Sequence, residues 1–129
     1  MTMTPAHPYS LLRFAGELAN LVAGLLILAG HFAIVYGVHA VACARGLAER
    51  TLFGFGAVPF VVTVATALAL LGSGIVLAIA LRDLRTLRGD DEASDSQRFL
   101  TYTSATIAGF SILAIVWVAL PAAILPPCR

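Results

Sequence analysis

Residues 18–44 read LANLVAGLLILAGHFAIVYGVHAVACA, an apolar run of 27 residues without a charged side chain. A helix needs about 20 residues to cross the hydrocarbon core of a bilayer, which is about 30 Å thick. The bilayer interior offers no water to the backbone, so a run of this length must satisfy its hydrogen bonds within a helix. The run therefore predicts a transmembrane helix and decides the class of the protein.

Two further stretches repeat this pattern. Residues 57–81 and 99–125 are also long and apolar, and no series of alternating ten-residue segments, as a membrane β-barrel requires, is visible. With their flanking turns, helices are expected over about residues 11–44, 53–88 and 96–125, after a loose lead-in at residues 1–10. The sequence thus predicts an all-α protein, in which residues 1–129 form a single membrane domain. Its architecture is an integral membrane bundle of three transmembrane helices.

The composition excludes several other classes of protein. Hydrophobic residues make up 60% of the 129 residues, charged residues 12%, and the mean hydropathy is +0.94. A soluble domain is about 45–50% apolar and about 25% charged, and a disordered chain has low hydrophobicity. The net charge of +1 lacks the clustered basic face of a nucleic-acid-binding protein. We therefore expect the lipid bilayer and other membrane subunits or a second copy as partners, and no nucleic acid.

Arginines predict the orientation, because the chain contains no lysine. In a three-helix topology, the N-terminus and the second connection lie on the same side of the membrane. That side carries Arg13, Arg82, Arg85, Arg88 and Arg98, and the other side carries Arg45, Arg50 and Arg129. The positive-inside rule then predicts the N-terminus in the cytoplasm and the C-terminus outside. Gly89 predicts the end of the second helix, and Ser94 with Gln97 resembles a capping box for the third.

The strongly polar residues of the first helix gather on one face. At about 100° per residue, all of them fall within a sector roughly 100° wide. This polar stripe consists of Arg13, Glu17, Asn20, His31 and His39. Polar groups in a bilayer face the protein interior or a water-filled cavity. We expect the stripe to pack against the other two helices or against a partner protein.

Each member of the stripe has a plain and a functional interpretation. Arg13 precedes Glu17 by one turn, which predicts an ion pair at the membrane surface. His31 lies close to the middle of the membrane, either hydrogen-bonded to a Ser or Thr across the bundle or part of a proton path or cofactor site. His39 lies near the outer surface beside Tyr36, with the same alternatives.

The residue inventory gives no catalytic constellation and predicts no cofactor and no metal. A six-coordinate haem takes two axial ligands, normally from facing helices, but the second and third helices contain neither His nor Met. Only an oligomer, or a partner subunit, could complete such a pair with His31 or His39. His39 and Cys43 are four residues apart, yet no third metal ligand lies nearby. No nucleotide-binding loop and no nucleophile–base arrangement is present, so we expect no enzymatic activity.

Cys43 ends the first helix and Cys128 follows the third. In a three-helix topology both lie on the same face, which is the predicted outer face. An exported location permits disulfides, so a bond that ties the two helices together is one expectation. Two free thiols are the other.

Three segments resemble a known group of proteins. These are HFAIVYGVHAVAC at residues 31–43, Arg98-Phe99-Leu100 at the start of the third helix, and the terminal Leu125-Pro126-Pro127-Cys128. They resemble small, poorly characterised three-helix bacterial inner-membrane proteins, some of which accompany haem–copper oxidases or other respiratory complexes. The resemblance implies an accessory or assembly subunit of a larger membrane complex. We expect its polar stripe and small-residue faces to form the contacts. Two alternatives stay open: a haem- or proton-handling protein that uses His31 and His39 in an oligomer, and a small homo-oligomeric channel.

Overall fold

The structure, a computed structural model, describes the backbone of residues 8–126 and 128, and the side chains from residue 11 onward. Residues 1–7 of the expected lead-in lie outside the described part of the chain, and residues 8–10 already belong to the first helix. The elements are α1 (Pro8–Ala44), β1 (Thr51–Leu52), β2 (Phe55–Gly56), α2 (Ala57–Arg88) and α3 (Asp95–Ile124). Three helices are long and apolar enough to cross a membrane, which confirms the expected class.

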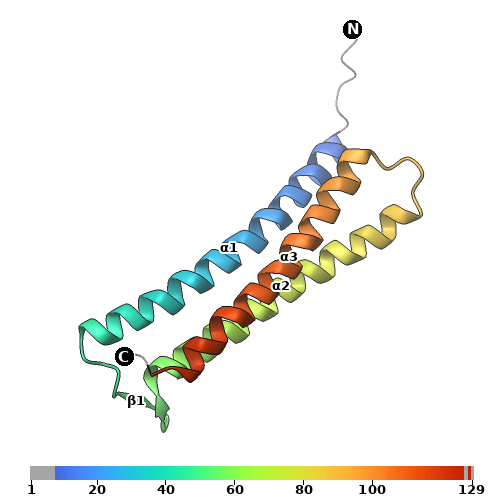
Figure 1. The fold of residues 1–129 in the computed structure, drawn as a ribbon. Coiled ribbons are helices and arrows are strands. Elements are labelled where there is room, and N and C mark those ends of the chain that lie inside the picture. The colour runs from blue at the N-terminus through green and yellow to red at the C-terminus, as the bar shows by residue number, and fades with distance from the viewer. Residues whose placement is uncertain (1–7, 127, 129) are drawn as a thin grey trace.

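The three helices form one elongated bundle (Figure 1). Helices α1 and α3 run in the same direction and α2 runs in the opposite direction, with each helix contacting both others. The first connection and the C-terminal end of α3 lie at one end of the bundle, and the second connection lies at the other end (Figure 1). This up-down-up order brings residues of α1 and α3 to matching depths.

The second helix starts four residues later than expected, because residues 53–56 belong to a small hairpin. Strands β1 and β2 pair antiparallel, with Thr51 opposite Gly56 and Leu52 opposite Phe55. Phe53 and Gly54 have φ angles of 53° and 84°, and two positive φ angles in a row are typical of the tight turn that joins paired strands. The sequence-based prediction of helix from residue 53 was therefore wrong. The expected boundary at Arg88 is confirmed.

The second connection follows the expected capping pattern. Gly89 caps α2 in a right-handed conformation, with φ −91°, and its N–H bonds back to the last turn. Ser94 caps α3, where its hydroxyl accepts a hydrogen bond from the backbone N–H of Gln97 at 3.3 Å. This bond gives an acceptor to one of the four N–H groups at the start of a helix that have no partner within the helix. Pro121 lies inside α3, which continues to Ile124.

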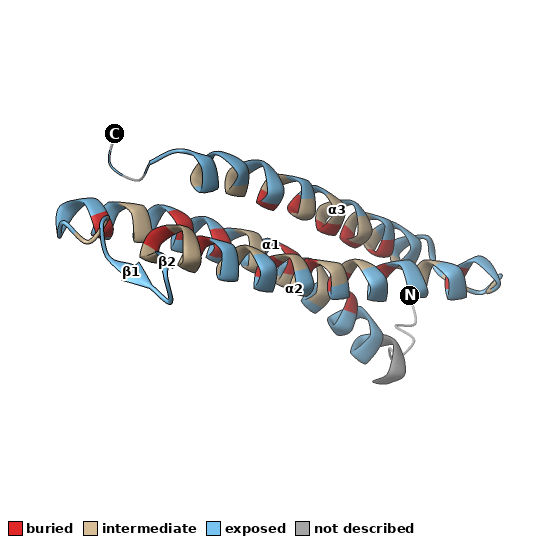
Figure 2. Cartoon of the chain, turned by 90° about the horizontal axis from the view of Figure 1, so that it is seen from below, coloured by how far each residue is buried: buried red, intermediate tan, exposed pale blue. Residues whose placement is uncertain are grey.

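Small side chains let the helices approach closely. Ala69, Ala80 and Ala108 are buried at helix contacts, and at Gly72 an added Cβ would lie 3.1 Å from Cδ1 of Ile27. Buried residues line the inner faces of all three helices, whereas the outer faces are exposed along their length (Figure 2). Without a hydrophobic force between helices in lipid, such close contact is what holds a membrane bundle together.

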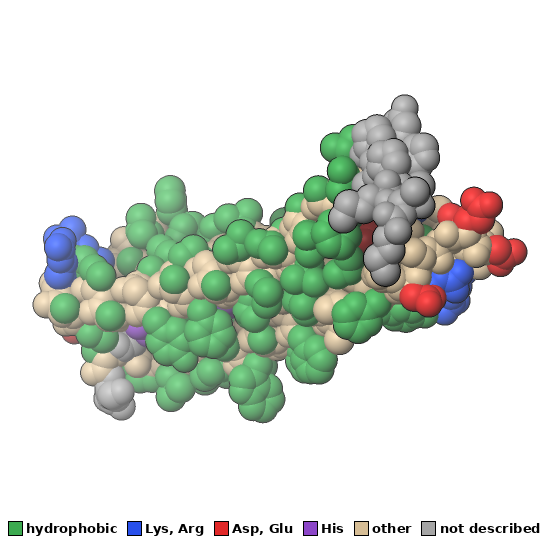
Figure 3. Space-filling model, turned by 90° about the horizontal axis from the view of Figure 1, so that it is seen from above, with side chains coloured by type: hydrophobic (Ala, Val, Ile, Leu, Met, Phe, Trp, Pro, Cys, Tyr) green, Lys and Arg blue, Asp and Glu red, His purple; other side chains and the backbone are tan. Residues whose placement is uncertain are grey.

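The surface divides into an apolar middle and charged ends. Hydrophobic side chains cover the length of the bundle on the face shown in Figure 3, basic groups lie at one end, and acidic and basic groups lie at the other. Large apolar side chains such as Leu26, Leu71 and Phe110 are more than 60% exposed. On a protein in water this surface would aggregate, but in a bilayer it is the lipid-contacting surface.

Candidate functional site

Among the residues whose side chains are described, six polar side chains are buried within the apolar bundle. They are Glu17, His31, Ser73, Thr101, Ser104 and Ser111. Within the described part of the chain, four of them contain a buried polar atom without a hydrogen-bond partner: Oε2 of Glu17, Nδ1 of His31, Oγ of Ser73 and Oγ of Ser104. A buried polar group without a partner costs roughly 1–3 kcal/mol, so this polar interior is the first candidate site.

His31 confirms the plainer of its two interpretations, a hydrogen bond to a hydroxyl across the bundle. Its Nε2 lies 3.1 Å from Oγ1 of Thr66 on α2. The Thr66 hydroxyl donates its own proton to the carbonyl of Val62 at 2.7 Å. Since that proton is already used, Nε2 of His31 must be the donor, and in the neutral ring Nδ1 is then the acceptor. Nδ1 is the buried atom that has no partner.

Two more bonds join α1 to its neighbours. Nδ2 of Asn20 donates to the carbonyl of Val76 at 3.5 Å. The hydroxyl of Ser111 bonds to the carbonyls of Ile107 at 2.8 Å and Gly24 at 3.4 Å. Glu17, Asn20 and His31 therefore face α2 and α3, as the first of the two expectations for the polar stripe had it. This inner part of the stripe is not available to a partner protein.

Glu17 lacks the expected close partner. Arg13 is exposed and acts on the Glu17 carboxylate electrostatically, as does Asp83 of α2. The buried Oε2 has no hydrogen-bond partner among the described residues, so the ion pair predicted from the sequence does not satisfy this oxygen. Burial explains the difference, because the Glu17 side chain turns into the bundle while that of Arg13 extends outward.

Ser104 lies at the same depth as Glu17. Ser111 reaches Gly24, and Ser104 and Glu17 each precede that pair by seven residues on helices that run in the same direction. Seven residues are about two helical turns. The two unpartnered oxygens of Glu17 and Ser104 therefore mark one buried polar layer near the arginine-rich end of the bundle.

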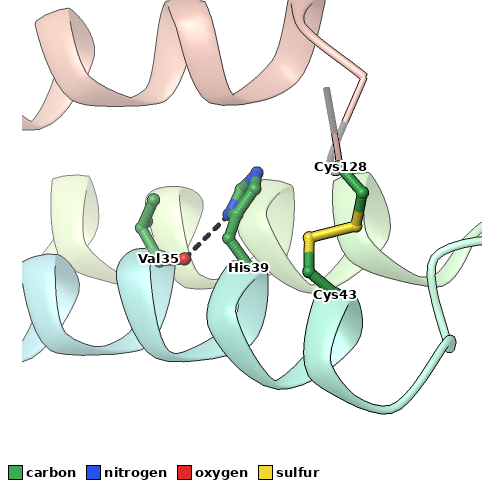
Figure 4. Close-up of a disulfide and its surroundings, with 4 residues drawn as sticks. All are labelled: Val35, His39, Cys43 and Cys128. Atoms are coloured by element: carbon green, nitrogen blue, oxygen red, sulfur yellow. Dashed lines mark hydrogen bonds between the residues drawn. A yellow bond between two sulfur atoms is a disulfide. The ribbon is translucent and has the colours of Figure 1, made fainter.

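His39 occupies a different environment from His31. Its Nδ1 lies 2.8 Å from the carbonyl oxygen of Val35, one turn earlier on α1, and its ring lies between α1 and α3 (Figure 4). A groove of about 320 Å³ opens here, with Tyr36 and His39 on the α1 side and Val118, Pro121 and Leu125 on the α3 side. We call it the His39 groove. His31 faces α2 and His39 faces α3, so the fold does not bring the two rings to one ligand.

The two cysteines form the expected disulfide. Cys43 in the last turn of α1 and Cys128 beyond the end of α3 are bonded, with their Cα atoms 5.5 Å apart across a sequence separation of 85. The bond closes the end of the bundle one turn beyond His39 (Figure 4). No described cysteine is free. The disulfide therefore links α1 to the chain beyond α3, at the outer end of the His39 groove.

The outer side of α1 carries a feature that sequence reasoning missed. Five small residues alternate at intervals of three and four positions and are all exposed: Gly30, Ala33, Gly37, Ala40 and Ala44. We call this set the small-residue stripe. Around Gly30 and Gly37, nothing lies within 4 Å of an added Cβ. On a helical wheel the stripe is centred roughly 160° from the buried residues of the same segment.

The missed feature had a sequence signal, namely its 3-4 spacing. Small residues at four-residue spacing also occur on the other two helices, as Ala69 and Ser73 and as Ser104 and Ala108, but these are buried in contacts of α2 and α3 with their neighbours. Spacing alone does not tell an internal contact from an open one. Only the placement of the helices shows that the stripe on α1 is left uncovered.

The described residues contain no group of three or more His, Cys, Asp or Glu side chains that could hold a metal ion. The buried polar layer and the His39 groove thus offer hydrogen-bonding chemistry, with one basic ring nitrogen in an apolar groove. No protein-family model, no curated protein and no solved structure matches this chain. Any function must therefore be argued from the site itself.

Proposed function

We propose that this chain is a non-catalytic accessory or assembly subunit of a larger complex in a bacterial cytoplasmic membrane, and that it docks through the small-residue stripe of α1. The resemblance to small inner-membrane proteins that accompany haem–copper oxidases makes respiratory complexes the first partners to test. Of the two contact surfaces expected from the sequence, the polar stripe and the small-residue faces, this proposal keeps only the second. Glu17, Asn20 and His31 face inward, and the contact moves to the opposite side of the helix.

The observation that carries the proposal is the open space above Gly30 and Gly37. Association of helices in lipid depends on close packing, and small residues at a regular interval permit it. The alternation of three and four residues matches the seam of helices that cross at about 20°. A single helix of another subunit fits such a seam along Gly30 to Ala44, a length of about 21 Å at 1.5 Å per residue.

Two independent features support the proposed orientation, with the N-terminus in the cytoplasm. Five of the eight arginines lie at the end that holds the second connection, and cytoplasmic segments are rich in positive charge. The disulfide lies at the opposite end, and disulfides persist in the oxidising space outside the cytoplasmic membrane. Both support an outer location for the first connection and residue 128.

The test compares two pairs of glycines. In tagged protein expressed in its native membrane, Gly30→Leu/Gly37→Leu fills the stripe, whereas Gly74→Leu/Gly109→Leu makes the same change at two half-buried positions of α2 and α3, away from the stripe. Nothing lies within 4 Å of an added Cβ at any of the four positions, so we expect all variants to retain the fold. Gentle detergent extraction, read by mass spectrometry and visible absorption, then reports the partners. Overpacking an interface costs about 1–3 kcal/mol, so we expect at least about a fivefold loss of partner in the stripe variant only.

Each alternative function gives a different result in this experiment. Unchanged partner yield in the stripe variant contradicts docking through the stripe. Cross-links between identical chains that disappear in the same variant favour the homo-oligomer, and ion flux in liposomes would then identify a channel. A lone chain with a haem spectrum supports the haem-binding alternative instead of the accessory role.

A further inference from the structure

The His39 groove contains a base whose chemistry is fixed by the backbone. The carbonyl oxygen of Val35 can only accept a hydrogen bond, so Nδ1 of His39 carries the proton in their 2.8 Å contact. In the neutral ring, Nε2 is then a lone pair that accepts hydrogen bonds. No described residue bonds to Nε2. The same arrangement, with one ring N–H donated to a backbone carbonyl, is how proteins fix a histidine for use at its other nitrogen.

The walls of the groove select the kind of molecule that could use this lone pair. Val118, Pro121 and Leu125 are apolar, and Tyr36 adds an aromatic ring that stacks on Phe32 with ring centroids 5.4 Å apart. His39 lies one turn inside Cys43, close to the membrane surface, and the groove faces the lipid-contacting side of the bundle. A ligand therefore needs an apolar body soluble in the bilayer and one hydroxyl group that donates.

A metal ion fits the groove less well than an organic ligand. His39 is its single nitrogen ligand, and the described residues hold no cluster of metal-binding side chains. One lone pair in an apolar groove instead suits one hydrogen-bond donor. The volume of about 320 Å³ is at the lower end of the range for small-molecule sites, about 300–1,000 Å³.

We propose that the His39 groove binds a lipid-soluble hydroquinone (a quinol), whose hydroxyl donates to Nε2 of His39 and whose ring lies against the apolar walls. The oxidised quinone carries carbonyl oxygens, which only accept, so it cannot form this bond. The groove thus discriminates by redox state through binding alone. The disulfide between Cys43 and Cys128 links the two sides of the groove at its outer end. This proposal is independent of docking through the small-residue stripe, because it concerns the other side of α1 and a chain without partners.

Trp117 provides a local probe for the test. It is the only tryptophan in the chain, is exposed, and lies one turn before Pro121 on α3. The purified full-length chain is placed in phosphatidylcholine nanodiscs, with empty nanodiscs as the blank for partitioning. Decylubiquinone is added until it quenches Trp117 fluorescence, and decylubiquinol is then titrated as a competitor under anaerobic conditions. A second portion of the quinone-loaded sample, without quinol, is titrated with more decylubiquinone.

We expect the quinol to bind about 2- to 12-fold more tightly than the quinone, the ratio that one hydrogen bond contributes. In His39→Phe, which fills the same space without a lone pair, the ratio should fall to one. His31→Phe is an unsuitable control because it disrupts the interior, so Tyr102→Phe, at an exposed position of α3 outside the groove, serves as the control that leaves the groove unchanged. It should retain the preference.

Three results would overturn the proposal. The first is equal binding of quinol and quinone, and the second is a preference that survives in His39→Phe. The third concerns the other source of a hydroxyl donor, a lipid headgroup. If phosphatidylglycerol in the nanodiscs displaces the quinone and the two redox forms do not differ in phosphatidylcholine, the groove holds a lipid.

Discussion

Two histidines on the same helix, eight residues apart, have opposite surroundings. His31 is 2% exposed and bonds across the bundle to Thr66. His39 is half-buried, bonds only to its own helix at Val35, and turns its second nitrogen toward the groove between α1 and α3. The inner histidine keeps its Nε2 occupied and its Nδ1 enclosed, whereas the outer one keeps its Nδ1 occupied and its Nε2 accessible.

The two side chains are chemically identical, so the depth of each histidine in the bundle and the direction of its ring decide what its nitrogens can bind. At 1.5 Å per residue the two rings are about 12 Å apart along the helix axis. This distance separates the middle of the hydrocarbon core from its outer part. The inner ring therefore stabilises the contact between α1 and α2, and the outer ring remains available to a ligand. The following substitutions test that division, from the largest expected effect to the smallest.

A lysine at each histidine should separate the two environments most clearly. His31→Lys places a charge near the middle of the membrane with no acidic partner at that depth, and an unpaired buried charge costs about 3–5 kcal/mol. His39→Lys should cost less than about 1 kcal/mol, because a long side chain near the surface reaches the headgroups. Both are measured as the free energy of unfolding in SDS titration of detergent-solubilised protein, followed by Trp117 fluorescence. Similar losses for the two variants would contradict the division.

Removal of the disulfide should act on the His39 end of the bundle. The bond closes a separation of 85 residues, and the typical effect of such a bond on the free energy of unfolding is about 2–4 kcal/mol. We expect Cys43→Ser/Cys128→Ser to lower the free energy of unfolding by an amount near the lower end of this range, because the membrane already restrains the unfolded chain. Relative to the native chain, hydrogen exchange in the same variant should accelerate more at residues 121–126 than at residues 101–108. Equal acceleration at both segments would show that the bond does not act locally.

The sequence predicts the fold well because the membrane removes most alternatives. Three apolar runs, the capping serine at Ser94 and the boundary at Arg88 all follow from length, hydropathy and local chemistry, and each agrees with the structure. The hairpin at residues 51–56 could not be read in the same way. Its turn contains a phenylalanine at positive φ, Phe53, a residue type that gives no turn signal, beside an apolar run that reads as helix.

The site was only partly predictable, for a different reason. The polar stripe follows from spacing along one helix. The three-helix topology permits the disulfide, beside the alternative of two free thiols, and a hydroxyl partner is one of the two interpretations of His31. The rotation and register of the neighbouring helices decide which hydroxyl meets His31, namely that of Thr66. They also decide which face of α1 stays open. Rotation and register are set by contacts such as that of Gly72 with Ile27. Each contact contributes little, and only the sum of many of them decides between alternative arrangements of the helices. The direction of the His39 ring depends on them in the same way.

Removal of the Thr66 hydroxyl gives the smallest and most specific test of the inner histidine. Thr66→Val keeps the shape of the side chain but leaves the Nε2–H of His31 buried without an acceptor, which costs roughly 1–3 kcal/mol. Thr63 is the matched control, because it lies three residues earlier on α2 and its hydroxyl also donates to a carbonyl four residues back, that of Pro59 at 2.7 Å. It has no histidine partner, so Thr63→Val should change the free energy of unfolding by less than about 0.5 kcal/mol. Thr66→Ser restores the acceptor and should recover most of the loss. If Thr66→Val and Thr63→Val behave alike, the bond between His31 and Thr66 contributes nothing measurable, and the inner histidine would have to be held by packing alone.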